Sequence, residues 1–375
     1  MSDLISPTFT SDARYMAHAL RLAENGTLTF RHNPAVGCVI VKNGVIVGEG
    51  WHHKAGTPHA EVHALAMAGE HTKGATAYVT LEPCSHYGRT PPCALALVNS
   101  GVSRVVCAMQ DPNPLVAGKG LQILKDAGIE VSSGLMESSA RALNQSFLSR
   151  MERQRPFVRV KLATSMDGRT ALANGKSQWI TGEFARADVQ KLRARSGAIV
   201  TGIETVLADD PALTVRLAGF EDFQPLRVIL DSQLRISLEA QILQQAGQTL
   251  IVTLATTRDQ QADKISALEA LGVQVITLSA TQQERIDLNE LVHYLAKTHH
   301  INDLLVEAGA TLAGAFVEAG LVDELWWYTA NSIMGQNARA GLITPNFHSM
   351  QEIYHWTLKD QRLIGQDQRM ILTIK

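Results

Sequence analysis

The chain has 375 residues, of which 45% are hydrophobic and 19% charged, and its formal net charge is −2. One hydrophobic core rarely supports so long a chain, so we expect a globular protein of two domains or more. The charge excludes the broad basic surface typical of nucleic-acid binding, and no apolar run approaches a membrane span. Four cysteines and a polar N-terminus without a leader-like apolar segment favour a reducing, cytoplasmic compartment.

The first third of the chain predicts alternating helices and strands. Residues 10–12 (Thr-Ser-Asp) are typical of a helix N-cap, and the helix should end at Gly26. Asn43-Gly44 between β-branched runs predicts a hairpin. Pro58 should open a helix that ends near Gly69. A mixed sheet with helices on both faces is favoured by further strands at residues 75–81, 104–109 and 129–131, and by helices from residue 93 and at 121–127.

Chemically distinctive residues lie at or near the ends of these elements. His59-Ala60-Glu61 is followed by Cys84 and Cys93. One imidazole and two thiols give zinc three protein ligands and leave its fourth position for water. Glu61 is placed to move protons without binding the metal, as in zinc deaminases. The spacing departs from the deaminase signature, because the two cysteines are nine residues apart rather than three.

Other functions could use the same residues. A structural zinc site would need a fourth ligand, and His63 lies one helical turn after His59. The catalytic interpretation is favoured because the strand before Cys84 delivers it to a C-terminal strand end, where open α/β sheets place their sites. The presence of Glu61 argues against a non-catalytic zinc scaffold. A nucleic-acid-editing deaminase would need a basic, aromatic surface, and only 5% of the residues are aromatic.

A charged stretch at residues 150–156 is expected to link two domains, 1–149 and 150–375. The second domain contains neither G-x-G-x-x-G nor a P-loop motif, which argues against an ordinary Rossmann domain. Its Gly-rich run from Val306 to Gly314 leaves two interpretations open, an anion site at a helix N-terminus or small residues that allow close packing. Strands are expected at residues 157–163, 198–201, 226–231, 249–253, 273–277, 303–307 and 324–329, and helices at 183–195, 287–298 and 311–319.

Long motifs in both halves are similar to those of one enzyme family. They occupy residues 33–38, 50–61, 80–86, 88–93, 111–114, 161–170, 177–181 and 209–216. With them, the chain resembles the bifunctional deaminase/reductases of bacterial riboflavin biosynthesis over nearly its whole length, and the long interval between Cys84 and Cys93 is a feature of that family. The resemblance implies an α/β fold, an N-terminal cytidine-deaminase-like αβα domain followed by a dihydrofolate-reductase-like α/β domain.

The resemblance also implies two successive reactions. One Zn²⁺ per chain, on His59, Cys84 and Cys93, would serve the hydrolytic deamination of diaminohydroxyphosphoribosylaminopyrimidine, with Glu61 as the catalytic residue. NADPH would then reduce the ribosyl group of 5-amino-6-(5-phosphoribosylamino)uracil to ribityl. Small phosphoribosyl pyrimidines are the expected partners of a homo-oligomer, dimer or tetramer, without nucleic acid or membrane. The alternative is a nucleic-acid or nucleoside zinc deaminase with an accessory nucleotide-binding domain.

The remaining site residues follow from the same resemblance. In the deaminase, His53 is an alternative to its neighbour His52, and the guanidinium of Arg89 suits the substrate phosphate. The deaminase substrate would be bound by Asn33, His52, His86, Arg89, Asp111 and Asn113. In the reductase, NADPH would be bound by Ala163, Trp179, Thr205, Asp209, Ser232, Gly309, Ala310, Thr311, Leu312, Ala313, Gly314 and Ala315. The reductase substrate would be bound by Ser177, Arg193, Leu213, Arg216 and Glu307.

Three points about the reductase stay open at the level of sequence. Lys161 and Asp167 would also line the site, without an assigned proton. Trp179 could equally be a core residue, as aromatics usually are. Asp231 would repel the extra phosphate of NADPH, so we expect it to face away and to cap its own turn, leaving Ser232 and Arg235 for the phosphate.

Overall fold

The computed structural model describes residues 7–28, 32–54, 56–87, 91–114 and 116–374. The chain divides into two compact units, Met1–Arg153 and Gln154–Lys375. The division falls within residues 150–156, the charged stretch that was expected to link the two domains. The first four residues of this stretch belong to helix α6 (Gln145–Arg153). Among the described helices, none is long and apolar enough to cross a membrane.

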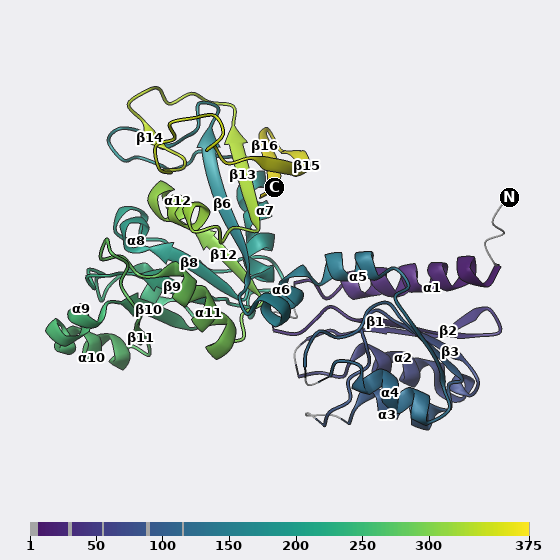
Figure 1. The fold of residues 1–375 in the computed structure, drawn as a ribbon. Coiled ribbons are helices and arrows are strands. Elements are labelled where there is room, and N and C mark those ends of the chain that lie inside the picture. Colours follow the sequence, from purple (N-terminus) through teal and green to yellow (C-terminus); the bar gives the residue numbers. More distant parts are fainter. Residues whose placement is uncertain (1–6, 29–31, 55, 88–90, 115, 375) are drawn as a thin grey trace. The chain divides into compact units, whose positions relative to one another are not determined.

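The first unit is built on a five-stranded mixed sheet in the order β2-β1-β3-β4-β5. Strands β1, β2 and β3 of this sheet are labelled in Figure 1. Strands β1 and β2 form the predicted hairpin, in which Asn43 and Gly44 have φ of 50° and 78°. Positive φ at both positions is what a two-residue type I′ turn requires. Strand β1 (Gly37–Lys42) pairs antiparallel with both β2 (Val45–Trp51) and β3 (Thr76–Val79), while β3, β4 (Arg104–Cys107) and β5 (Glu130–Ser133) run parallel.

Helices cover both faces of this sheet. Successive side chains of a strand point to opposite faces, so a strand that is apolar throughout presents apolar side chains on both faces. Val39 and Val41 pack on one face with residues of α1 (Pro7–Glu24), α5 (Glu137–Leu143) and α6. Cys38 and Ile40 pack on the other face with residues of α2 (Ala60–Ala68), α3 (Cys93–Ser100) and α4 (Lys119–Asp126). The αβα architecture predicted for this unit is thereby confirmed. A short 3-10 helix, η1 (Gly69–Thr72), follows α2.

Two predicted helix starts are wrong. Helix α1 begins at Pro7, so residues 10–12 lie inside it rather than in front of its first turn. The carboxylate of Asp12 instead accepts hydrogen bonds from Arg104 and Tyr78, which ties the helix to β4 and β3. Helix α2 begins at Ala60 rather than at Pro58, and His59 stands in front of it as an extended N-cap residue.

The second unit has a nine-stranded sheet in the order β11-β10-β9-β8-β12-β6-β13-β16-β15. All neighbours from β11 to β13 run parallel. Every strand predicted for this unit is present within a few residues of the expected bounds: β6 (Phe157–Ser165), β8 (Ala198–Gly202), β9 (Leu226–Leu230), β10 (Thr249–Thr253), β11 (Gln274–Thr277), β12 (Asp303–Glu307) and β13 (Glu324–Ala330).

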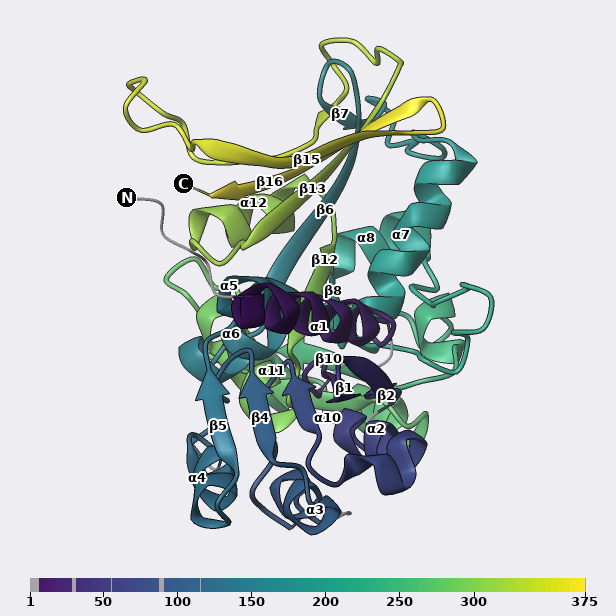
Figure 2. The same ribbon diagram turned by 90° about the vertical axis from the view of Figure 1, so that its right-hand side faces the viewer.

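An antiparallel hairpin that was not predicted extends this sheet beyond β13. It consists of β15 (Trp356–Ile364) and β16 (Asp367–Ile374), and Figure 2 shows it beside β13 and β6. No residue of β15 is buried. An edge strand without a buried face lacks the apolar alternation by which a strand is recognised in a sequence.

Helices again form a layer on each face. Residues of α11 (Leu288–Thr298) and α12 (Ala310–Glu318) pack on one face, and residues of α7 (Glu183–Arg195), α8 (Ile203–Asp209) and α10 (Ala262–Ala270) pack on the other. The predicted α/β architecture with helices on both faces is confirmed here too. The remaining elements are β7 (Arg169–Ala171), η2 (Gln241–Gln244), α9 (Ala255–Gln260) and β14 (Arg339–Ala340).

Candidate functional site

Sheet topology gathers the predicted deaminase residues at one edge of the first sheet. Strands β3 and β4 are parallel, so the loops that follow them leave from the same edge. Strand β1 begins and β2 ends at that edge, because Gly37 pairs with Trp51 and Cys38 pairs with Val79. Segments far apart in sequence, carrying Asn33, His52, Cys84 and Asp111, therefore converge.

His59, Cys84 and Cys93 form a compact group at this edge. Their ligand atoms all lie within 4.8 Å of one another. His59 Nδ1 is 3.2 Å from Cys93 Sγ and 3.6 Å from Cys84 Sγ. His59 precedes α2 and Cys93 opens α3, and the N-terminus of a helix favours a thiolate.

The pKa shifts of these three side chains indicate which of them hold a proton when no metal ion is bound. A hydrogen bond from Cys93 lowers the pKa of Cys84 to about 4, against the effect of burial, with a further contribution from His59. The interaction with Cys84 raises the pKa of Cys93 and of His59. A cation that displaced the retained protons would meet two thiolates and a neutral imidazole, the donor set of zinc.

Glu61 lies in the first turn of α2 and is only 3% exposed. Its Oε2 is buried and has no hydrogen-bond partner among the described residues, and burial raises the pKa of the carboxyl group. Buried polar atoms are nearly always paired, so an orphaned carboxylate oxygen points to a missing partner. In contrast, His63 is not part of the group with His59, and its ring stacks on His53 at 4.4 Å. The alternative with His63 as a fourth ligand is therefore not supported.

His52, rather than His53, lies beside this group. Its ring meets that of His59 edge to face, with centroids 5.3 Å apart. Its Nδ1 is 3.3 Å from the carbonyl oxygen of Pro58, and its Nε2 is 3.0 Å from Asn33 Nδ2. The carbonyl can only accept, so Nδ1 carries the proton and Nε2 accepts from the Asn33 amide.

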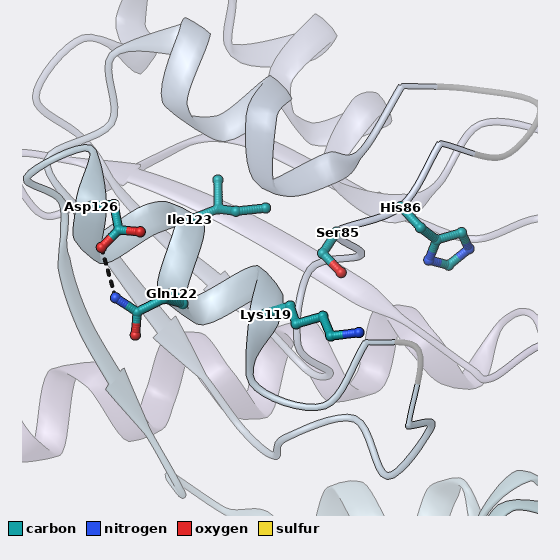
Figure 3. A pocket seen from close by; sticks show the side chains of 6 residues that line it. All are labelled: Ser85, His86, Lys119, Gln122, Ile123 and Asp126. Carbon is teal, nitrogen blue, oxygen red and sulfur yellow. Dashed lines mark hydrogen bonds between the residues drawn. The ribbon is translucent and has the colours of Figure 1, made fainter.

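The loop after β4 brings in the other predicted residues. Asp111 is 8% exposed and accepts a hydrogen bond from the Asn113 backbone N–H at 2.8 Å. Burial raises the pKa of Asp111 to about 6. His86 lines an open pocket of about 420 Å³ together with Ser85 and residues of α4, which lie opposite them in Figure 3. Arg89 lies outside the described residues.

In the second unit, the predicted cofactor residues also follow the ends of parallel strands. Thr205 and Asp209 lie in α8 after β8, and Ser232 follows β9. Gly309 and residues 310–315 of α12 follow β12, so the predicted turn is the start of a helix, and Ala163 lies near the end of β6. Hydrogen bonds join α8 to Gly309 and to Ser177. Thr205 Oγ1 accepts from the Gly309 N–H at 3.2 Å, and Ser177 Oγ donates to Asp209 Oδ1 at 3.0 Å.

Two of the predicted substrate residues of this unit, Arg193 and Glu307, form a largely buried ion pair. Arg193 donates to both oxygens of Glu307, at 2.6 and 2.9 Å, and to the carbonyl of Thr214. Lys161 is paired with Glu307 in the β-ladder, and burial lowers its pKa. The Arg216 N–H donates to Gln190 at 2.8 Å, and Leu213 is buried nearby in sequence with φ of 47°.

The structure shows the surroundings of three residues that the sequence left open. Trp179 is not a core residue, because it is 70% exposed, with the Arg186 guanidinium 4.5 Å from its ring centroid. Asp231 caps its own turn as predicted, accepting from the Ile236 N–H at 2.8 Å. Asp167 anchors a loop, since hydrogen bonds from Ser165 and from the Met334 and Gly335 N–H groups lower its pKa to about 2.

The two interpretations of the Gly-rich run apply to different residues. A Cβ on Gly314 would lie 1.6 Å from the Ile343 carbonyl oxygen, so this glycine is required for close packing. A Cβ on Gly309, the N-cap residue of α12, would meet only Thr205 Oγ1 at 3.8 Å. Close packing therefore does not require a glycine at residue 309.

Both units match known families. Residues 9–109 match the cytidine and deoxycytidylate deaminase zinc-binding region, and residues 156–368 match the RibD C-terminal domain. The chain is 50% identical over 367 residues to the riboflavin biosynthesis protein RibD of Escherichia coli K12, covering 95% of this chain and 97% of that protein. The Haemophilus influenzae protein of the same name is 48% identical and covers 98% of each.

Solved structures agree over both units. RibD of Acinetobacter baumannii superposes with a TM-score of 0.90 at 48% identity, covering 98% of this chain and 99% of that one. A diaminohydroxyphosphoribosylaminopyrimidine deaminase/5-amino-6-(5-phosphoribosylamino)uracil reductase from Thermotoga maritima gives 0.84 at 29% identity, over 98% of this chain and all of its own. A nucleic-acid deaminase with an accessory domain is not favoured. The chain belongs to the RibD family of bifunctional deaminase/reductase enzymes of riboflavin biosynthesis.

Proposed function

We propose that His59, Cys84 and Cys93 hold one zinc ion per chain, and that Glu61 is the proton shuttle of the deaminase. The donor set and the compact spacing of the three side chains fit zinc. When bound, zinc would supply Lewis acidity and lower the pKa of a coordinated water toward about 7. Glu61 would take one proton from the attacking water and give it to the ring nitrogen. It would then carry the second proton, from the new hydroxyl group, to the amine, which leaves as ammonia.

The substrate of this site would be diaminohydroxyphosphoribosylaminopyrimidine, which the name of the Thermotoga maritima relative states for that enzyme. Asn33, His52, Asp111 and Asn113 would hold the pyrimidine. Asn33 and His52 are already joined by a hydrogen bond, so their polar atoms are oriented before a ligand arrives. His86 and Arg89 would meet the phosphoribosyl group, in keeping with the position of His86 in an open pocket.

The second unit would bind NADPH along the ends of its parallel strands and reduce the ribosyl group of the deaminated product. NADPH supplies a hydride, and the protein positions and charges the site. The open N-terminus of α12 suits a phosphate, and Ser232 would meet the extra phosphate of NADPH while Asp231 is held in its own turn. Arg193, Arg216 and Glu307, with Ser177 and Leu213, would bind the reductase substrate.

The observation that carries the deaminase assignment is the orphaned Glu61 oxygen in the first turn of α2, directly after the candidate ligand His59. The purified chain with zinc should release ammonia from the pyrimidine and then oxidise NADPH, followed by its absorbance. Ammonia release without subsequent NADPH oxidation would refute the reductase assignment. The absence of ammonia release by a zinc-loaded chain would refute the deaminase assignment.

A further inference from the structure

Glu82 has a buried carboxylate. It is neither one of the three candidate zinc ligands nor one of the predicted substrate-binding residues. It lies two residues before Cys84 and is 3% exposed. No ion pair of Glu82 is found among the described residues. Its partners are backbone N–H groups, which makes the carboxylate an anchor for a chain segment rather than a partner of another side chain.

Those N–H groups all come from the segment that follows β4. Oε2 accepts from Asp111 at 3.2 Å and from Gly118 at 2.9 Å. Oε1 accepts from Gly120 at 2.9 Å and from Leu121 at 3.4 Å. Residues 118–121 form the start of α4, so the carboxylate also occupies the N-terminus of this helix, where a negative charge is favourable.

Close packing also fixes the contact between the start of α4 and residues 82–84. A Cβ on Gly120 would lie 1.9 Å from the Pro83 carbonyl oxygen, so the segment can approach Glu82-Pro83-Cys84 only with glycine at this position. The Glu82 N–H also donates to the Met109 carbonyl at 3.0 Å. The loop that carries Cys84 and the loop that carries Asp111 and Asn113 are therefore joined at one carboxylate.

We propose that Glu82 is a positioning residue of the deaminase, which holds Asp111 and Asn113 in place relative to Cys84. The inference rests on the proposed function, in which those two residues bind the pyrimidine. Asp111 donates its own N–H to Glu82 and accepts the Asn113 N–H, so the position of Asn113 depends on Glu82 through one intermediate residue. Glu82 acts on substrate binding through this chain of hydrogen bonds and takes no part in proton transfer.

The test is Glu82→Gln in the zinc-loaded full chain. The amide keeps one accepting oxygen but turns an NH₂ group toward N–H donors, so half of the anchor is lost. Supporting partners of a site are typically worth 10–100-fold, so we expect kcat/KM for deamination to fall about 10–100-fold. The loss should appear mainly as a higher KM, with one zinc retained and the NADPH-dependent rate unchanged. Glu70→Gln, at a 90% exposed side chain, is the matched control and should change nothing.

A double-mutant cycle distinguishes positioning from a general loss of stability. Because Glu82 acts through the Asp111–Asn113 segment, Glu82→Gln should cost much less activity in an Asn113→Ala background. Equal costs in both backgrounds, an unchanged KM, or loss of zinc would each overturn the proposal. If Glu82→Gln does not fold, Gly120→Ala displaces the same junction: a higher KM supports the proposal and an unchanged KM overturns it. An inactive wild-type chain would instead refute the proposed deaminase function.

Discussion

At the scale of single residues, the deaminase site combines groups that protein interiors normally avoid. Two neighbouring thiols lie within hydrogen-bonding distance of a histidine, and a carboxylate oxygen of Glu61 is buried without a partner among the described residues. Such an arrangement costs stability in the metal-free chain, because buried polar atoms without partners are expensive. A metal ion and its water at this position would offset the cost, so we expect metal binding to stabilise the first unit.

Cys84→Ser and Cys93→Ser should each lower zinc content and deamination together, because each removes one of three ligands. Zinc is measured by atomic emission of the dialysed protein. Cys107→Ser is the control, since this buried cysteine donates its hydrogen bond to the Met109 carbonyl and a serine can do the same. Full zinc occupancy in the Cys84→Ser, Cys93→Ser double mutant would show that these cysteines are not the ligands.

NADPH should be preferred over NADH by at least about tenfold in kcat/KM, which requires only about 1.4 kcal/mol of differential binding. Ser232→Asp should narrow or reverse this preference by placing a negative charge near the extra phosphate, without changing deamination. Arg235 is paired with Glu204, so its contribution should be smaller than that of Ser232. Ser237→Asp, at an exposed serine nearby, is the control. Equal use of both cofactors by the wild type would contradict a phosphate site at the end of β9.

At the scale of elements, the centre of the second sheet is held by buried charges. Arg159 of β6 is 2% exposed and lies between Asp303 of β12 and Glu324 of β13. Lys359 and the Trp326 indole N–H complete the partners of Glu324. Three neighbouring strands are thus joined by one network, in which each charge depends on the others.

Removing one member of this network should be far more costly than removing an exposed ion pair. Arg159→Met removes the buried cation that Asp303 and Glu324 share, and leaves them only the more exposed Arg195 and Lys359. We expect a loss of about 3–5 kcal/mol in the free energy of unfolding. Arg362→Met, whose partner is Asp360 and whose side chain is 66% exposed, should cost less than about 1 kcal/mol. Urea unfolding of the second unit measures both, and equal losses would contradict the network's role.

The same network predicts a dependence of stability on pH. Although burial acts in the opposite direction, Arg159 and Lys359 lower the pKa of Glu324 from 4.5 to about 2. Because the folded pKa is the lower one, the stabilisation is fully present above pH 4.5 and is lost as the pH falls through 2. Glu324→Gln should therefore flatten the fall in the urea midpoint between pH 4.5 and pH 2.5. An unchanged slope would exclude Glu324 as its source.

The structure also shows which features can be recognised in a sequence and which cannot. The Asn43-Gly44 hairpin and the buried parallel strands depend on local signals, and they were predicted within a few residues. The group of His59, Cys84 and Cys93 was predicted from its residue types and from the motifs of the deaminase/reductase family, although the two cysteines are farther apart than in the general deaminase signature. The roles of Asp12 and Glu82 were not, because their partners lie 92 and up to 39 residues away in sequence. The exposed strand β15 offers no apolar alternation to recognise.

At the scale of the whole molecule, the two units carry separate chemistry in one chain. Each has its own sheet, its own core and its own set of predicted site residues at the ends of parallel strands. Nothing in the proposed deaminase mechanism uses a residue of the second unit, and the reverse also holds. The two activities should therefore be separable by single substitutions. Assembly into a homo-oligomer and a cytoplasmic location remain predictions from the sequence.

The role of Glu61 is tested most directly by measuring both the deaminase and the reductase activity of Glu61→Gln. The substitution removes the proton shuttle but none of the three zinc ligands, so zinc should stay at about one per chain. Ammonia release should fall by at least 10²-fold, the typical range of a general acid–base group. The same protein, given the already deaminated substrate, should oxidise NADPH at the wild-type rate. Near-normal ammonia release by Glu61→Gln would contradict the central claim that Glu61 moves the protons of the deaminase.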